Sequence, residues 1–388
     1  MKLKCRPEDF RVEELPTTSP GRAGRFVYYR LIKRGLGTLE AVEVIRRRWN
    51  LSAWQIRYGG LKDRHAETIQ YLTILNGPER PFRDSRIDLE PLGRLDRPYS
   101  SQDFRGNRFA LVIRDLSREA ADRAKRAAED VPRDGLPNYF DDQRFGSIGP
   151  GGEFLGEAWL KGDAERALKL AIAGFNPHDR APQRAIKKAL NGNWGRWHEA
   201  KQALPRSHER SIVTYLADHP TDFDGAFCRL NRDLRSLYFS AFQSDLWNRM
   251  LAAWLGRELR PEQLSEVEFK VGPLPFPCGL DPDQIGRFHG LMLPLPCART
   301  KLPGGPLRDL ADSVLEPRGL TWEALRIKKM DDVFFGKGQR AASFVPAGWI
   351  SKLADDELHP GRLRWDVGFE LPRGAYATIV VKRLTDVR

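Results

Sequence analysis

A short polar turn between two predicted strands carries the residues best suited to chemistry. The segment 58–65 contains Tyr-Gly-Gly-Leu-Lys-Asp-Arg-His, so Asp63 follows two glycines and stands among Lys62, Arg64 and His65. Glycine lets the backbone approach a ligand closely, and neighbouring cations favour a charged carboxylate and can also hold a phosphate. An ionised Asp63 can act as a nucleophile or as a general base. On spacing alone, the simpler interpretation is a turn-forming Asp.

The segments on either side of this turn have strand patterns. Ile56 and Tyr58 begin a short strand before it, and Thr68–Leu75 continues as a strand after it. Aromatic and β-branched residues favour strands, and this composition also predicts strands over Phe26–Ile32 and Phe109–Ile113. The turn is therefore expected at the edge of a sheet.

Two helices are predicted between these strands. Thr38 can N-cap a helix whose apolar residues recur every three or four positions, and Ser117 can cap a later Ala/Arg-rich helix. The other side of the first helix carries Arg46–Arg48. Strands mixed with helices predict an α+β sheet domain.

The middle and the C-terminal part of the chain have different patterns. Helical patterns dominate over 163–255, most strongly over Leu237–Trp254. Arg364–Leu371 predicts a strand, and after a Pro-Arg-Gly turn the β-branched run in Tyr376–Lys382 is typical of a strand buried on both faces. The simplest organisation is a sheet domain built from both ends of the chain, with a more helical domain inserted between about 147 and 345.

The composition favours a polyanionic partner. The 388 residues include 64 Lys+Arg and 52 Asp+Glu, giving a net charge of +12. Such a basic chain suits nucleic acid or an acidic membrane surface. No apolar run approaches the roughly 18 residues of a membrane span, and the N-terminal segment lacks the apolar stretch of a signal peptide, so we expect a cytoplasmic protein.

The cysteines do not predict a metal site. None of the four forms a Cys-x-x-Cys pair, and no His stands at zinc-finger spacing from them. We therefore expect free thiols and no structural zinc.

Five segments, in order along the chain, resemble the signature motifs of the TruD family of pseudouridine synthases. Gly60–Gln70, with Gly-Leu-Lys-Asp-Arg-His-Ala, resembles the catalytic motif of that family. The other four segments that resemble family motifs are Arg6–Glu13, Gly106–Phe109, Pro137–Gly146 and Phe369–Thr378. One such match would be weak evidence, but five in order are highly specific.

The resemblance implies a role for each matching residue. The catalytic Asp of the family falls on Asp63. The positions that contact the substrate base are Phe10, Asn107, Phe109 and Tyr376. The positions expected to support the site or contact phosphates are Glu8, Lys62, Gln70 and Arg144. Taken without the resemblance, Phe10 and Phe109 are more simply core aromatics, and Asn107 a turn residue.

The resemblance also implies a fold. It is an α+β fold with a mixed, mainly antiparallel pseudouridine synthase sheet flanked by helices, and with a second, TruD-specific α+β domain inserted in the chain. The expected catalytic domain is discontinuous, comprising residues 1–146 and 346–388, and the inserted domain comprises residues 147–345.

The implied function is the conversion of a specific uridine of RNA to pseudouridine. By resemblance the best target is uridine 13 of tRNA, flipped into a cleft between two basic domains. The reaction needs no cofactor or metal, which agrees with the absence of a P-loop, a dinucleotide fingerprint or a metal-ligand cluster in the sequence. The expected partner is RNA, with no membrane and no obligate protein partner, and a monomer is the default.

Alternatives remain at this point. The scaffold could bind RNA without catalysis, or Asp63 could serve a metal-dependent nuclease together with Glu67 or Asp141 and Asp142. Candidate phosphate contacts are the basic runs Arg46–Arg48, Lys187–Lys188 and Lys328–Lys329.

Overall fold

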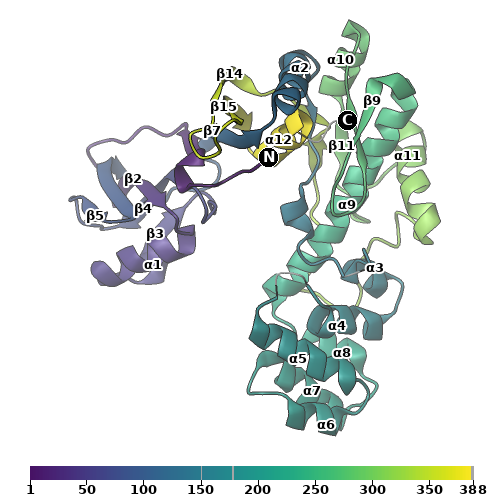
Figure 1. Ribbon diagram of the computed structural model, residues 1–388. Helices are drawn as coiled ribbons and strands as arrows, with labels where there is room; N and C mark the ends of the chain where they lie inside the picture. Colours follow the sequence, from purple (N-terminus) through teal and green to yellow (C-terminus); the bar gives the residue numbers. More distant parts are fainter. Residues whose placement is uncertain (150, 177–178, 386–388) are drawn as a thin grey trace. The chain divides into compact units, whose positions relative to one another are not determined.

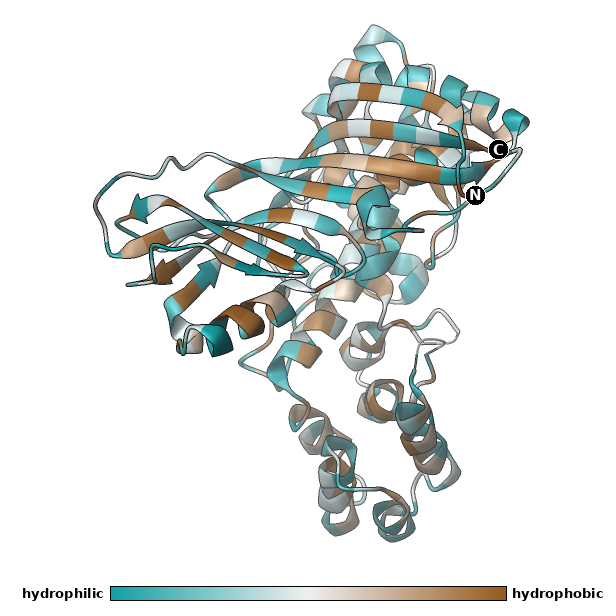
Figure 2. Ribbon diagram, turned by 60° about the vertical axis from the view of Figure 1, so that its left-hand side comes forward, coloured by the Kyte–Doolittle hydropathy of each residue, from teal (hydrophilic) through white to brown (hydrophobic). Residues whose placement is uncertain are grey.

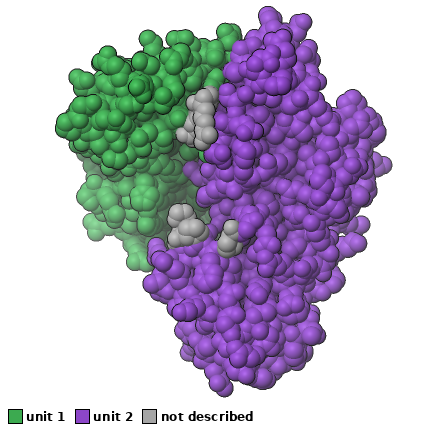
Figure 3. All heavy atoms as spheres, turned by 45° about the vertical axis from the view of Figure 1, so that its right-hand side comes forward, with its two compact units in different colours: residues 1–136, 344–387 green, residues 137–343, 388 purple. Residues whose placement is uncertain are grey.

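The computed structural model of the protein describes residues 1–149, 151–176 and 179–385, and they form two compact units. Unit 1 comprises residues 1–136 and the described chain from 344 onward, and unit 2 comprises residues 137–343 (Figure 3). The chain crosses between units at the short strands β8 (Leu136–Pro137) and β13 (Ser343–Phe344). The expected junctions, 146/147 and 345/346, differ from these crossings mainly because the segment 137–146 belongs to unit 2.

Unit 1 is built on one nine-stranded sheet (Figure 1). The strand order is β14-β15-β7-β1-β4-β2-β6-β5, with β3 paired to β4. The pair β1–β4 is parallel, and the other pairs described in this sheet are antiparallel. The strands are β1 (Phe10–Pro16), β2 (Phe26–Arg34), β3 (Ile56–Tyr58), β4 (Glu67–Leu75), β5 (Phe82–Asp84), β6 (Ile87–Leu95), β7 (Phe104–Leu116), β14 (Ala347–Asp355) and β15 (Leu363–Pro372). The expected α+β class with a mixed, mainly antiparallel sheet is confirmed.

Alternating apolar side chains attach helix α1 (Thr38–Arg48) to this sheet. Tyr29 and Leu31 of β2 point to the same face, because alternate residues of a strand share a face. They form one core cluster with Ala41 and Ile45 of α1. Bands of apolar and polar residues alternate along the strands in Figure 2.

Two further helices of unit 1, α2 (Arg118–Asp134) and α12 (Ala377–Thr385), pack on each other, and α2 also contacts β7, β14 and β15. Ser117 caps α2 as expected, since its side chain accepts a hydrogen bond from the amide of Ala120.

The prediction of a strand over Tyr376–Lys382 is wrong, because most of this segment forms α12. β15 already has β7 and β14 as neighbours, so no sheet edge remains beside it for the next segment. The apolar residues Ile379, Val380 and Leu384 are buried in the helix instead. Tertiary burial here overrides the strand preference of β-branched residues.

Unit 2 is mainly helical, with short two-stranded sheets β9–β10 and β11–β12. The predicted helix over Leu237–Trp254 is confirmed within α9. The helices of this unit are α3 (Leu155–Leu160), α4 (Ala164–Ala173), α5 (Ala181–Gly192), α6 (Trp197–Ala203), α7 (His208–Asp218), α8 (Phe223–Cys228), α9 (Arg232–Glu258), α10 (Pro282–Gly290) and α11 (Pro306–Leu315). Its strands are β9 (Leu264–Val267), β10 (Leu274–Pro277), β11 (Met292–Pro294) and β12 (Gln339–Ala341).

Across the described chain, no helix combines the length and apolar character needed to cross a membrane. All four cysteines are free thiols.

Candidate active site

One row of side chains crosses the middle of the unit 1 sheet. Lys33, Thr68, Val12, Phe109 and Phe369 are successive cross-strand neighbours on β2, β4, β1, β7 and β15. Directly opposed residues project to the same face of a sheet. This register gathers residues from both ends of the sequence beside the loop that carries Asp63.

Two polar side chains hold the loop between β3 and β4. The Thr38 hydroxyl accepts a hydrogen bond from the Lys62 amide at 2.8 Å and donates one to Gln70 Oε1 at 2.8 Å. Gln70 is fully buried, and its Nε2 donates to the carbonyl of Gly60 at 3.5 Å. The prediction that Thr38 caps α1 is therefore wrong: Gly37 is the N-cap, and the Thr38 hydroxyl binds the loop.

The two glycines of this loop differ in their surroundings. A Cβ on Gly59 would lie 2.7 Å from the ring of Phe104, so only glycine fits there. Gly60 has open space around its Cα. Gly59 thus makes a close backbone approach to an aromatic side chain of β7, and an approach of this pair to a ligand stays a prediction.

Lys33 anchors the same loop from inside the sheet. Its Nζ donates to the carbonyls of Leu36 at 2.6 Å, Asp63 at 2.8 Å and Lys62 at 3.3 Å. The side chain is fully buried. Burial lowers the pKa of Lys33 to about 8, although the neighbouring Asp63 charge acts in the opposite direction.

Asp63 faces solvent on one side and a cation on the other. Its carboxylate accepts a hydrogen bond from Lys4 Nζ at 2.8 Å, and 40% of its side-chain surface is exposed. Lys4 Nζ also lies 4.1 Å from the centroid of the Phe10 ring. Lys4 therefore joins Asp63 to Phe10, and the carboxylate stays accessible to a ligand.

Lys62 joins the loop to Asn107 on β7. Its Nζ donates to Asn107 Oδ1 at 2.9 Å and lies 2.9 Å from the Glu14 carboxylate. Glu14 is fully buried and accepts a hydrogen bond from the Tyr71 amide at 3.0 Å and from the Tyr99 hydroxyl at 3.3 Å. A buried carboxylate with these partners fixes the position of the Lys62 ammonium.

The predicted aromatic residues differ in their contacts. Phe109 is 8% exposed and packs between Phe10, edge to face with centroids 6.3 Å apart, and Phe369, stacked at 5.6 Å. Tyr376 is half-buried just before α12. Its segment follows the end of β15, where Leu371 pairs with Asn107.

The turn before Tyr376 also reaches Phe104. Arg373 donates to the carbonyl of Ser101, and its guanidinium lies 6.0 Å from the centroid of the Phe104 ring. Lys62 Nζ lies 5.1 Å from the same centroid. Phe104 thus links the C-terminal turn to the network of Lys62.

Glu8 lies on the other face of the sheet from Phe109. It lines an open groove of about 340 Å³ with Ala110 and Val112, which alternate with Phe109 along β7. The expected supporting role of Glu8 stays a prediction.

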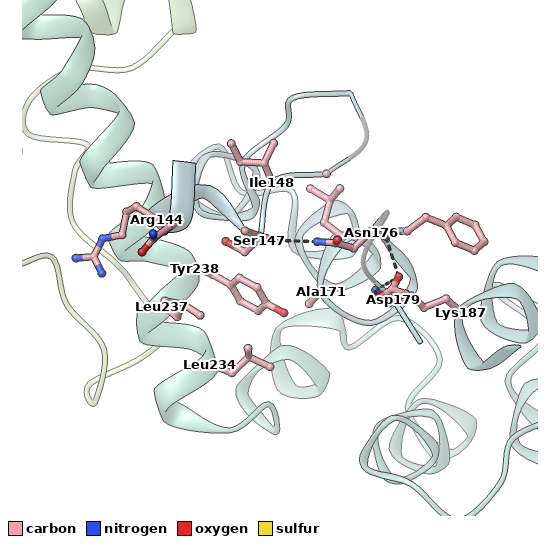
Figure 4. A pocket seen from close by; sticks show the side chains of 16 residues that line it. Arg144, Ser147, Ile148, Ala171, Asn176, Asp179, Lys187, Leu234, Leu237 and Tyr238 are labelled. Atoms are coloured by element: carbon pink, nitrogen blue, oxygen red, sulfur yellow. Dashed lines mark hydrogen bonds and ion pairs between the residues drawn. The ribbon is translucent and has the colours of Figure 1, made fainter. Parts of the chain in front are cut away.

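Arg144 lies in unit 2, at a cavity of about 380 Å³ (Figure 4). Its Nε donates to the Ser244 hydroxyl at 3.2 Å, and its guanidinium lies 5.7 Å from the centroid of the Phe140 ring. Figure 4 shows the guanidinium pointing away from Tyr238 and Asn176, which line the same cavity.

Four side chains of the network were not predicted as site residues: Lys4, Glu14, Lys33 and Phe104. Strand alternation gives a signal for two of them. Glu14 continues the inward series begun by Phe10 and Val12, and Lys33 continues that of Tyr29 and Leu31. A charge at an inward position requires a buried partner. Lys4 has no comparable signal, since its partner is 59 residues away in sequence.

Within the described residues, no group of three or more His, Cys, Asp or Glu side chains is arranged to hold a metal ion.

Comparisons with known proteins agree with the motifs. The family model of tRNA pseudouridine synthase D (TruD) matches residues 1–268 and 285–384. The Methanococcus maripaludis protein named "Probable tRNA pseudouridine synthase D 1" is 28% identical over 399 residues, covering 100% of both chains. The Leptospira interrogans protein named "tRNA pseudouridine synthase D" is 29% identical over 400 residues, covering 98% of this chain and 95% of that protein.

A solved structure has the same fold. The crystal structure described as a "Putative tRNA pseudouridine synthase D (TruD)" from Methanosarcina mazei superposes with a TM-score of 0.78 at 24% identity, covering 99% of this chain and 93% of that one. Because the family model spans nearly the whole sequence, the chain belongs to the TruD family of tRNA pseudouridine synthases, which are isomerases.

Proposed function

We propose that this protein converts uridine 13 of tRNA to pseudouridine without a cofactor, with Asp63 as the catalytic carboxylate. The observation that carries the proposal is the network around Asp63. The accessible Asp63 carboxylate pairs with Lys4 at 2.8 Å, and Lys4 also lies over the Phe10 ring. The adjacent Lys62, which is half-buried, holds Asn107. Apart from Lys4, these residues lie in the motif segments through which the chain resembles its family.

The proposed reaction rearranges one nucleotide and needs no second substrate. The bond between C1′ of the ribose and N1 of uracil breaks, the detached base turns, and C5 bonds to C1′. C5 loses its proton and N1 gains one, so atoms and charge balance. Asp63 can attack C1′ as a nucleophile or remove a proton at the ribose 2′ position. Both routes require an ionised carboxylate, and the Lys4 ammonium pairs with it at 2.8 Å.

The neighbouring residues supply the means to hold a detached base. Asn107 offers an amide, whose NH2 group stays available because Lys62 donates to its oxygen. Lys62 in turn is held by Glu14. We assign base contacts to Phe10, Asn107, Phe109 and Tyr376, with Phe109 supported from behind by Phe369. Extruding the target base from folded RNA costs on the order of a few kcal/mol, which phosphate contacts can offset.

The direct test uses purified protein and unmodified tRNA transcripts. We expect one pseudouridine, at position 13, mapped by a chemical probe specific for pseudouridine and primer extension. A transcript with cytidine at position 13 is the matched control and should gain none. Modification at another position would contradict the assigned target, and none in any transcript would contradict the proposed activity.

Asn107→Ala separates base recognition from RNA binding. We expect a fall in kcat of about 10-fold to 100-fold, corresponding to one base-directed hydrogen bond worth about 1.5–3 kcal/mol. RNA affinity should change by less than about twofold, because phosphate contacts position the RNA and contribute most of the binding. Single-turnover kinetics and filter binding give the two numbers, and equal losses in both would contradict a role at the base.

A further inference from the structure

The basic runs expected to bind phosphates differ in whether their side chains already form ion pairs with carboxylates of the protein. Arg46 and Arg47 both bind Glu43, with N–O distances of 2.6 Å. Hydrogen bonds from these two arginines lower the pKa of Glu43 to about 2. Lys187 binds the Asp179 carboxylate at 2.7 Å (Figure 4). Much of the charge in these runs is therefore neutralised within the protein.

Helix α5 of unit 2 presents a different arrangement. Arg180, at its N-cap, and Arg184 and Lys188 recur every fourth residue, so they lie on one side of the helix over about 12 Å. All three are exposed. Within the described chain none of them forms an ion pair with a carboxylate; Arg184 uses only its Nε, on the backbone carbonyl of Asp179.

Arg196 extends this line of charge. Its guanidinium donates to the carbonyl of Gly192, the next four-residue step after Lys188, and to Asn193 Oδ1 at 3.3 Å. It is also exposed. We call Arg180, Arg184, Lys188 and Arg196 the α5 stripe.

The sequence around the α5 stripe carries an excess of positive charge. Residues 180–210 contain eight Lys or Arg and two Asp or Glu. Helix α2 is also exposed and rich in arginine, but its 17 residues contain five Lys or Arg and five Asp or Glu. Only a local excess of one sign gives a field that attracts a polyanion.

We propose that the α5 stripe binds backbone phosphates of the RNA substrate. This inference rests on the proposed function, because it takes RNA as the substrate. An acidic membrane is the poorer partner. Of the larger apolar residues of α5, Leu190 is buried and Ile186 half-buried, and the helix packs on α4. No apolar side remains on α5 to insert into lipid, as an interfacial helix requires.

The test removes three positive charges from the α5 stripe and compares this variant with a control that loses three positive charges elsewhere. The variant is Arg180→Gln/Arg184→Gln/Lys188→Gln, which leaves Arg196 on the end of the helix. The matched control is Arg123→Gln/Lys125→Gln/Arg126→Gln, three exposed cations of α2. Glutamine keeps a helix propensity close to that of Arg and Lys. Circular dichroism and thermal melting check that both variants keep the fold and the thermal stability of wild type.

Affinity for an unmodified tRNA transcript is measured between about 50 and 200 mM salt. We expect the slope of log affinity against log salt to fall in magnitude by about two in the stripe variant, because each lost phosphate contact removes about 0.7–0.9. The control should keep the wild-type slope. At saturating RNA the stripe variant should retain the wild-type kcat, while its KM rises about tenfold or more. Lys188→Gln alone should lower the slope by about one.

Equal slopes in the stripe variant and the α2 control would overturn the proposal. So would an unchanged RNA slope accompanied by lost binding to vesicles of phosphatidylserine and phosphatidylcholine, since the stripe would then serve a membrane. A wild-type protein that binds tRNA steeply with salt but forms no pseudouridine would refute the proposed function. The difference in salt slope between the stripe variant and the α2 control would still decide whether the α5 stripe binds phosphates.

Discussion

Asp63→Asn should abolish pseudouridine formation while leaving the fold and RNA binding intact. The substitution keeps the size of the side chain and an oxygen for the Lys4 hydrogen bond, but it removes the negative charge that both proposed routes need. We expect the single-turnover rate to fall by at least about 10³-fold, within the range for loss of a group that transfers protons in the transition state. Quantitative pseudouridine mapping on tRNA transcripts measures the rate.

The surroundings of Asp63 explain why the fold should survive this change. Lys4 is 25% exposed at its side chain, so its ammonium remains hydrated when its partner becomes neutral. The Asp63 carbonyl keeps its bond to Lys33, because that contact uses only backbone. Asp122→Asn, on the exposed side of α2, is the matched control and should behave as wild type. A rate for Asp63→Asn within tenfold of wild type would remove this carboxylate from the mechanism.

Patterns within single elements allow much of the fold to be predicted. The strands around Ile56–Tyr58, Thr68–Leu75 and Arg364–Leu371 follow from residue type and alternation, and the structure confirms them. Helix α9 follows from its apolar periodicity. These signals are local, because a half-buried strand or helix must show its buried side in its own sequence.

The errors arise where distant segments decide the outcome. The β-branched run after Tyr376 favours a strand by itself, but β15 has no free edge to accept one. The Thr38 hydroxyl suits an N-cap, yet it binds the Lys62 amide and Gln70 instead. The local sequence reveals neither the occupied edges of β15 nor the loop partners of Thr38, since both depend on which elements become neighbours in space.

The candidate site shows the same division. Asp63, Phe10 and Asn107 follow from motifs, as does Lys62, which binds Asn107. The link between Asp63 and Phe10 is made by Lys4, which lies outside the motifs. Lys4 reaches Asp63 across a separation of 59 residues. The pairing of Glu14 with Asn107 depends on the register between β1 and β7. A register is fixed by the whole sheet, so single segments cannot reveal it.

Lys33→Met should impair catalysis by releasing the loop that carries Asp63. Methionine is of similar length but offers no donor, so the carbonyls of Leu36, Lys62 and Asp63 lose the ammonium that binds all three. A displacement of the carboxylate by about 1 Å can cost about 10²-fold in rate, and we expect a fall in kcat of that order. RNA affinity should stay within about twofold, and single-turnover kinetics with filter binding separates the two effects.

The pH dependence of stability and of turnover tests whether the charge of Lys33 holds the loop. Burial lowers the pKa of Lys33 to about 8 from its usual value of 10.5. Between these pH values the unfolded chain holds more protons at this residue than the folded one. The free energy of unfolding therefore rises with pH above about 8, and this gain is lost as the pH falls back through that value. Relative to Lys33→Met, the free energy of unfolding of wild type should rise by on the order of 2–3 kcal/mol from pH 8 to pH 10.5.

Turnover should move in the opposite direction, because a neutral amine has two N–H groups for three carbonyls. Wild-type kcat should therefore fall above about pH 8, whereas the lower kcat of Lys33→Met should show no fall there. Lys352→Met, exposed on β14, controls for loss of a lysine and should follow wild type in both measurements. Parallel pH profiles for wild type and Lys33→Met would show that Lys33 does not titrate in this range and would refute its charge as the anchor of the loop.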